Sequence, residues 1–240
     1  TSAADAVANT NSRRRAAHLT TRIFGALWLM AALLLWLPSD IRAQGALTNG
    51  VLHQGTISPA GDSDTWTFSA SVGDSIVIRI GEIAGTNTFT PRIQLYNPSA
   101  VLISSSSGSS AAEVAVTATN GGTFTVVIDD NNGAHTGTGT YRLTLAKTGN
   151  SVVVSPGDNG GPMINGVMHL GTILTGDLDM WTFTANSGDN LVLRMGQITD
   201  TNTFYTWVRL YGPDGALLRS SVDTTAAEVF IRATNSGTFI

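Results

Sequence analysis

The chain has 240 residues and no cysteine, and charged residues make up 12% of it. The lack of cysteine excludes a disulfide framework and a thiolate metal site, and a hydrophobic content of 42% is too high for a disordered chain. A formal net charge of −4 disfavours nucleic acid as a partner. The abundance of Gly, Ser and Thr favours an all-β protein with many turns.

The N-terminal segment has the layout of a secretory signal peptide. An apolar run of 15 residues, Ile23–Leu37, follows a group of arginines, and Ile41-Arg42-Ala43 then offers a small residue for cleavage. We therefore expect residues 1–43 to form a helical signal peptide with an upstream segment. The run is shorter than the roughly 20 residues of a spanning helix, and an uncleaved membrane anchor is the alternative. The remaining 8 basic and 15 acidic residues give a charge of −7.

Two long stretches of the sequence occur twice. The segment NGVLHQGTI at 49–57 returns as NGVMHLGTI at 165–173, and GDSDTWTF at 61–68 returns as GDLDMWTF at 176–183. A period above 100 residues indicates tandem domains rather than a solenoid.

The repeats define the expected domain organisation. We predict a first β-sandwich domain at 44–149, a linker at 150–162 that is rich in Gly and Pro, and a second β-sandwich domain at 163–240. The second copy stops at Ile240, within the counterpart of a strand of the first copy. We therefore expect the second copy to be truncated and unable to fold alone, whereas the first copy should fold.

Apolar and polar residues alternate along most segments of the first copy. In DSIVIRI, for example, Ile76, Ile78 and Ile80 share one face, and Val77 and Arg79 share the other. Eight short strands with one apolar face predict two antiparallel sheets packed face to face, with a closed barrel as the alternative. The predicted strands lie near 51–57, 64–70, 74–83, 90–97, 101–106, 113–119, 122–129 and 139–146.

The Gly-Asp-Ser of the first copy raises the question of a serine nucleophile. Ser63 corresponds to Leu178 in the second copy, whereas Asp62, Asp64 and the following aromatic residues are retained. No motif places a histidine base nearby. The pattern therefore predicts an acidic turn that leads into a core strand, and we expect no catalytic residue in this region.

In this order the motifs resemble the bacterial pre-peptidase C-terminal domain family. The motifs are Gly55-Thr56-Ile57, Gly61-Asp62-Ser63-Asp64, Gly73-Asp74, Leu95-Tyr96-Asn97-Pro98, Gly122-Thr123-Phe124 and Gly139-Thr140-Tyr141. The chain departs from the family at Thr90-Pro91 and at the serine run Ser104–Ser107. The resemblance implies a jelly-roll-like β-sandwich on a secreted protein, often beside a peptidase, and calcium binding in some members.

Two acidic groups are candidate calcium ligands, namely Asp62 with Asp64 and Asp129 with Asp130. Ca²⁺ takes six to eight oxygen ligands, and Asp is also common in turns for local reasons. His53 and His169 are expected to be structural strand residues. The side chains of Tyr96, Tyr211 and Trp207 are expected to project from the sheet face opposite Leu95 and Leu210. As exposed aromatic rings they could bind a ligand.

The expected function is a non-catalytic binding, adhesion or spacer region, secreted or in the cell envelope, whose partner is an extracellular protein or polysaccharide. No cofactor other than calcium is expected. A membrane contact is expected only if the signal segment remains uncleaved. One alternative is an accessory region of a secreted hydrolase with its catalytic domain beyond residue 240. Another is a carbohydrate-binding module that uses the three aromatics.

Overall fold

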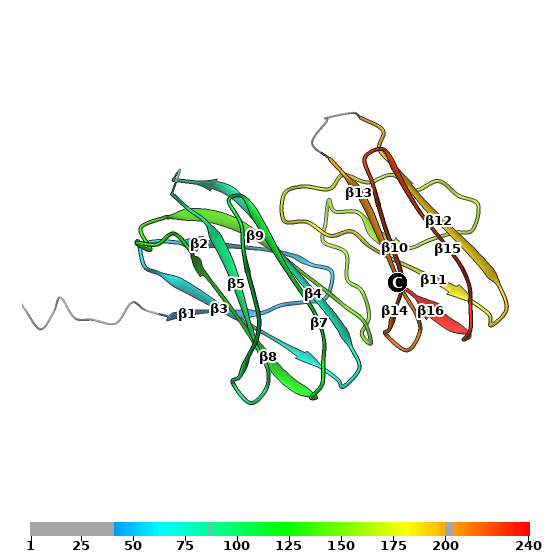
Figure 1. Ribbon diagram of the computed structural model, residues 1–240, viewed down its shortest axis with the longest axis horizontal. Coiled ribbons are helices and arrows are strands. Elements are labelled where there is room, and N and C mark those ends of the chain that lie inside the picture. The colour runs from blue at the N-terminus through cyan, green and yellow to red at the C-terminus, as the bar shows by residue number, and fades with distance from the viewer. Residues whose placement is uncertain (1–40, 87, 200–203) are drawn as a thin grey trace, which may run out of the picture. The chain divides into compact units, whose positions relative to one another are not determined.

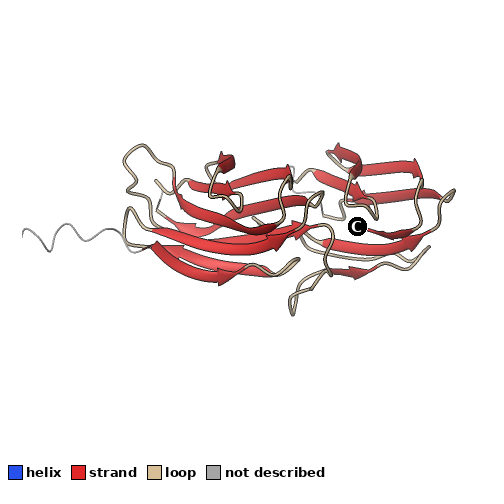
Figure 2. Cartoon of the chain, turned by 90° about the horizontal axis from the view of Figure 1, so that it is seen from below, coloured by secondary structure: helices blue, strands red, loops and turns tan. Residues whose placement is uncertain are grey.

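A computed structural model describes residues 41–86, 88–199 and 204–240. These residues form sixteen strands and no helix (Figure 2). The predicted signal segment lies outside the described residues apart from residues 41–43. Within the described ranges, no helix is long and apolar enough to cross a membrane.

The N-terminal half folds into two sheets (Figure 1), which confirms the all-β prediction. The first sheet has the order β1 (Ile41–Ala46), β3 (Ser63–Ala70), β8 (Gly122–Asp130), β5 (Pro91–Tyr96) and β6 (Leu102–Ser107). The second sheet has the order β2 (Leu52–Ile57), β9 (Gly139–Lys147), β4 (Ser75–Gly85) and β7 (Ala111–Thr117). The eight predicted strands agree with β2–β9 to within two residues.

One strand of this half was not expected. Strand β1 pairs in parallel with β3, with Ile41 opposite Ser63 and Ala46 opposite Thr67. The predicted boundary between signal peptide and domain, after residue 43, therefore falls inside β1. A short segment that pairs with a strand more distant in sequence carries no local pattern of its own, so β1 could not be predicted from alternation.

The core of the N-terminal half is built from the predicted inward faces. Ile76, Ile78 and Ile80 are fully buried together with side chains from the opposite sheet. Phe68 and Phe124 stack at 5.4 Å between ring centroids, and Trp66 is 6% exposed. Because each strand alternates, the same packing leaves a second, outward face on every strand for other contacts.

The C-terminal half repeats the β3–β8, β4–β7 and β5–β6 pairings at an offset of 115 residues. Its sheets are β10 (Gly160–Pro162), β11 (Met180–Ala185) and β16 (Gly237–Phe239); β12 (Asn190–Gly196) with β15 (Ala226–Arg232); and β13 (Thr206–Tyr211) with β14 (Leu217–Asp223). Arg194 lies opposite Glu228, as Arg79 lies opposite Glu113. Residues 160–162, the end of the predicted linker, belong to β10.

Residues 167–173, which repeat the sequence of β2, do not form a strand. In the N-terminal half, β2 pairs with β9 alone. Within the described residues, no strand pairs with this segment. Val167, Met168 and Leu170 are consequently exposed.

A buried hydrogen-bond chain joins the two sheets of the N-terminal half. Trp66 Nε1 on β3 donates to the Tyr141 hydroxyl on β9 at 2.9 Å, and that hydroxyl donates to Asp64 Oδ2 at 2.6 Å. Gln44 Nε2 on β1 donates to the other oxygen of Asp64 at 2.5 Å. Burial is the main cause that raises the pKa of Tyr141, so this hydroxyl remains a donor.

Gly55 of the predicted Gly-Thr-Ile motif lies directly beside this chain. A Cβ at Gly55 would lie 2.2 Å from the Tyr141 hydroxyl oxygen and 2.7 Å from Asp64 Oδ2. Any other residue would therefore displace the hydroxyl or the carboxylate. The motif that first suggested the family is explained by the space that this buried contact needs.

We predict that Tyr141→Phe lowers the free energy of unfolding by about 1–3 kcal/mol, because it leaves the buried Asp64 Oδ2 and the Trp66 indole without a partner. Tyr96→Phe removes a hydroxyl that has no hydrogen-bond partner among the described residues and should change stability by less than about 0.5 kcal/mol. Urea unfolding of both variants measures the difference. Equal losses would contradict the importance of this contact.

We also predict that a fragment of residues 41–156 melts cooperatively and that one of residues 158–240 does not, because the second fragment leaves the β12 edge and one face of β11 uncovered. Appending residues 126–149 after Ile240 supplies a counterpart of β9 and should give a cooperative transition. Far-ultraviolet circular dichroism during heating measures this. A cooperative melt of residues 158–240 without the added segment would contradict the prediction.

Candidate functional site

The Gly-Asp-x-Asp segment forms the same turn in both halves. Asp62 accepts the backbone N–H groups of Ser58 and Ser63 at 3.1 and 2.8 Å. Its counterpart Asp177 accepts those of Leu174 and Leu178 at 3.4 and 2.8 Å. The first aspartate therefore closes a turn whichever residue follows it, as expected from the exchange of Ser63 for Leu178.

The histidines of the described region are engaged by the fold. The rings of His53 and His169 lie 5.1 and 4.9 Å from Trp66 and Trp181, and each Nε2 accepts a backbone N–H, from Thr48 and Ile164. His135 Nδ1 contacts the carbonyl oxygen of Asp130 at 2.6 Å. Burial lowers the pKa of His53, in keeping with its role as a neutral acceptor.

The predicted calcium ligands of the N-terminal half all have protein partners. Asp129 receives Nε and Nη2 of Arg92 at 2.7 and 2.5 Å. Asp130 accepts the backbone N–H groups of Thr90, Asn132 and Gly137. Asp62 accepts the backbone N–H groups of the turn, and Asp64 accepts the Tyr141 hydroxyl. Each carboxylate is therefore already part of the hydrogen-bonding of the sandwich.

A different acidic group lies in the C-terminal half. Asp158 in the loop before β10 meets Asp177 and Asp179 in the turn before β11, and one carboxylate oxygen of each lies within 4.8 Å of the others. In the part of the chain that the structure describes, this is the one group of three such side chains. Its aspartates correspond to Asp62 and Asp64 of the first half, plus a third from the linker.

Asp179 differs from its counterpart Asp64 in what surrounds it. Asp179 Oδ1 is buried and has no hydrogen-bond partner within the described ranges, whereas both oxygens of Asp64 accept hydrogen bonds. A Cβ at Gly171 would lie 2.7 Å from Asp179 Oδ2, the same close approach as Gly55 makes to Asp64. The turn thus holds a buried carboxylate oxygen in place without the amide and hydroxyl donors that satisfy Asp64 in the first half.

The three carboxylates oppose one another's ionisation. Burial raises the pKa of Asp179 to about 7, and the charges of Asp177 and Asp158 add to the effect. Burial and the charge of Asp158 likewise raise the pKa of Asp177. Placing a cation among these oxygens would relieve both desolvation and repulsion.

The donor set suits a hard divalent cation. Calcium prefers carboxylate and carbonyl oxygens and takes six to eight of them, and an unpartnered buried carboxylate oxygen is an unfilled acceptor of that kind. The sequence contained the signal in the repeated Asp177 and Asp179, but Asp158 joins them only through the fold. Sequence reasoning named the first-copy pair and missed this group.

The predicted surface aromatics lie on outward faces as expected. Trp207 is 47% exposed, its Nε1 donates to Ser220 Oγ at 2.8 Å, and the guanidinium carbon of Arg209 lies 3.7 Å from its ring centroid. Tyr96 and Tyr211 are half-buried. Trp207 therefore offers the largest exposed aromatic surface of the three.

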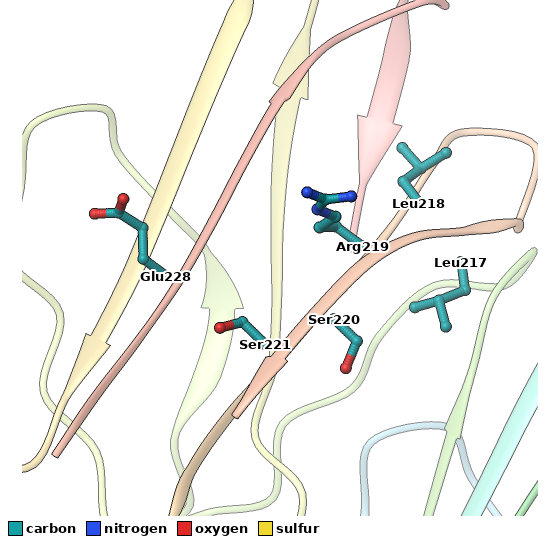
Figure 3. A pocket seen from close by; sticks show the side chains of 6 residues that line it. All are labelled: Leu217, Leu218, Arg219, Ser220, Ser221 and Glu228. Atoms are coloured by element: carbon teal, nitrogen blue, oxygen red, sulfur yellow. The ribbon is translucent and has the colours of Figure 1, made fainter. Parts of the chain in front are cut away.

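A pocket of about 460 Å³ lies between β14 and β15. Figure 3 shows Arg219 and Glu228 on these two strands, with Ser220 and Ser221 between them. Glu228 is already paired with Arg194, whose Nε donates to it at 2.8 Å. The pocket includes none of the side chains predicted from the sequence.

The comparisons with known proteins concern the N-terminal half most directly. No curated protein matches the chain. The crystal structure of the pre-peptidase C-terminal domain of a collagenase from Bacillus anthracis is similar at 17% identity, with a TM-score of 0.35, over 45% of this chain and 97% of that one. The sequence model of the bacterial pre-peptidase C-terminal domain matches residues 62–130. The chain is therefore similar to this family over residues 62–130.

Proposed function

We propose that the described region is a non-catalytic accessory module of a secreted or envelope protein, which binds or spaces rather than reacts. The observation that carries this proposal is that all three histidines of the described region bond to backbone groups instead of a serine hydroxyl. Without a base, Ser63 remains an ordinary alcohol. The family match at residues 62–130 supports the same role.

The proposal extends to the C-terminal half as a second copy of the same unit, with the first domain beginning at β1 and the second at β10 rather than at residues 44 and 163. The equal strand registers of β4–β7 and β12–β15 support this reading. The proposal also includes an accessory role beside a hydrolase domain in a longer protein, because the module itself would be non-catalytic in that case too. We assign a binding role to the exposed Trp207 surface rather than to Tyr96, which is half-buried.

The test compares the full chain with Ser63→Ala and Trp207→Ala. We expect no hydrolysis of p-nitrophenyl esters or casein by the full chain. We expect retention on insoluble collagen or polysaccharide to fall at least severalfold for Trp207→Ala and to stay unchanged for Ser63→Ala. Hydrolysis that disappears with Ser63→Ala would overturn the non-catalytic role, and equal retention of all three proteins would remove Trp207 from the binding surface.

We further propose that Asp158, Asp177 and Asp179 hold calcium. The support is the buried, unpartnered Asp179 Oδ1 together with three carboxylates within 4.8 Å. Bound calcium would fix the loop before β10 to the turn before β11, and its effect would be on stability. At Asp62 and Asp64 calcium would have to compete with Tyr141 and Gln44, and at Asp129 with Arg92, so we place the ion in the C-terminal half.

The pKa of Asp179 gives this proposal a pH dependence. Because its folded pKa of about 7 exceeds the unfolded value of 3.8, protonation favours the folded state, and this contribution is lost as the pH rises from about 4 through 7. Calcium binds the ionised form. Calcium should therefore raise the melting temperature at pH 8 and much less at pH 5.

Asp179→Asn should abolish the calcium effect, and in EDTA it should raise the melting temperature at pH 8 relative to the parent chain. Asp214→Asn removes one charge at an exposed turn and should leave the calcium effect intact. Differential scanning calorimetry in calcium and in EDTA measures all three proteins. A melting temperature at pH 8 that is the same in calcium and in EDTA would end the calcium proposal.

A further inference from the structure

The outward face of the β4–β7 sheet in the N-terminal half is covered by the C-terminal half. Ser75 Oγ donates to the carbonyl oxygen of Gly215 at 2.7 Å, and Thr144 Oγ1 donates to that of Gly176 at 3.0 Å. The Arg209 guanidinium pairs with Glu113. The turns at Gly176 and Gly215 and the outward side of β13 at Arg209 thus contact this sheet of the N-terminal half.

Gly81 shows how close this contact is. A Cβ at Gly81 would lie 2.4 Å from the backbone nitrogen of Gly176, so two backbones meet directly. Val77, which points to the same side, is only 4% exposed for the same reason. The docked face therefore consists of Val77, the Arg79–Glu113 ion pair and Gly81, which the turn at Gly176 contacts.

The same face recurs on β12 and β15, where it is uncovered. Val77, Arg79, Gly81 and Glu113 have the counterparts Val192, Arg194, Gly196 and Glu228. Val192 and its cross-strand neighbour Phe230 are each 59% exposed. A Cβ at Gly196 would have nothing within 4 Å, so no contact in this chain calls for glycine there.

The complementary turns recur, exposed, on the N-terminal half. The turn Pro59–Asp62 matches Leu174–Asp177, with the same hydrogen bond and a φ of 83° at both Gly61 and Gly176. The turn Asn97–Val101 matches Gly212–Ala216, and Ala100 keeps a positive φ of 58° where Gly215 has 83°. Val101 and Leu102 beside this turn are 55% and 46% exposed.

We propose that the β12–β15 face of one chain binds the Pro59–Asp62 and Asn97–Val101 turns of a second copy, head to tail. Gln94 takes the place of Arg209 in this contact and can donate an amide hydrogen bond to Glu228 in place of the ion pair, so the contact is weaker than the one within the chain. Val192 takes the place of Val77, which is 4% exposed under the contact within the chain. Because the two surfaces differ, the contact does not close on itself and builds open arrays.

The experiment is sedimentation velocity on the full chain over a range of concentrations. We expect the average mass to rise past that of a dimer. Val192→Glu and Gln94→Glu should each leave a monomer, because they place a charge at the counterparts of Val77 and Arg209. An equimolar mixture of the two should form a dimer and nothing larger, because one intact pair of surfaces remains. Val222→Glu places the same charge at a residue that is 62% exposed outside both surfaces and should leave the association unchanged.

Gly196→Ala separates docking from folding. It should leave the melting temperature unchanged, because a methyl group there meets nothing in the chain, and it should weaken association at least tenfold. A wild-type chain that stays monomeric at every concentration would overturn the proposal and leave the face to a further repeat or another protein. So would a mixture of the two glutamate variants that stays monomeric, or a Gly196→Ala chain that associates normally.

Discussion

The bond between the Tyr141 hydroxyl and the Asp64 carboxylate is the contact on which the N-terminal sandwich depends. It is the point at which β9 of one sheet meets β3 of the other, and Trp66 donates to the same hydroxyl. A buried carboxylate needs such donors, because leaving it unpaired costs more than most single packing contacts contribute. The glycine at Gly55 and the amide of Gln44 are arranged around this requirement.

The same carboxylate position acquires a different chemistry in the C-terminal half. Asp179 has the close glycine but not the tyrosine, and it gains Asp158 and Asp177 as neighbours. The same sequence pattern thus gives a carboxylate with hydrogen-bond donors on both oxygens at Asp64. At Asp179 it gives a carboxylate with a raised pKa and one buried oxygen that has no donor among the described residues. Within the described ranges, no hydroxyl like that of Tyr141 and no amide like that of Gln44 donates to Asp179. The acidic group can therefore be a cation site, while the turn that carries it is a structural element in both halves.

Most of the fold could be predicted from the sequence, because alternation along each strand is strong and the repeat confirms it. The inward isoleucines Ile76, Ile78 and Ile80 of β4 lie where the pattern placed them. Strand β1 and the unpaired state of residues 167–173 could not be predicted, because both depend on a partner strand distant in sequence.

The candidate site was predictable only in part. The aspartates of the turn are visible in the sequence, but which of them lacks a partner depends on three-dimensional neighbours such as Tyr141 and Asp158. The aromatic predictions were correct about the face, since alternation fixes direction, but not about exposure, which depends on what packs beside each ring. The alternation along a strand determines to which face a side chain points, and the contacts with other strands determine how much of it remains exposed.

Strand β6, at the outer edge of the five-stranded sheet, has serines from Ser104 to Ser107 along most of its length. An open edge exposes unpaired backbone groups that attract the strands of other molecules. The short hydroxyl side chains of Ser104 to Ser107 keep this part of the rim hydrated and give an incoming strand no apolar contact there. The serine run thus protects the larger part of the rim against amyloid-like growth.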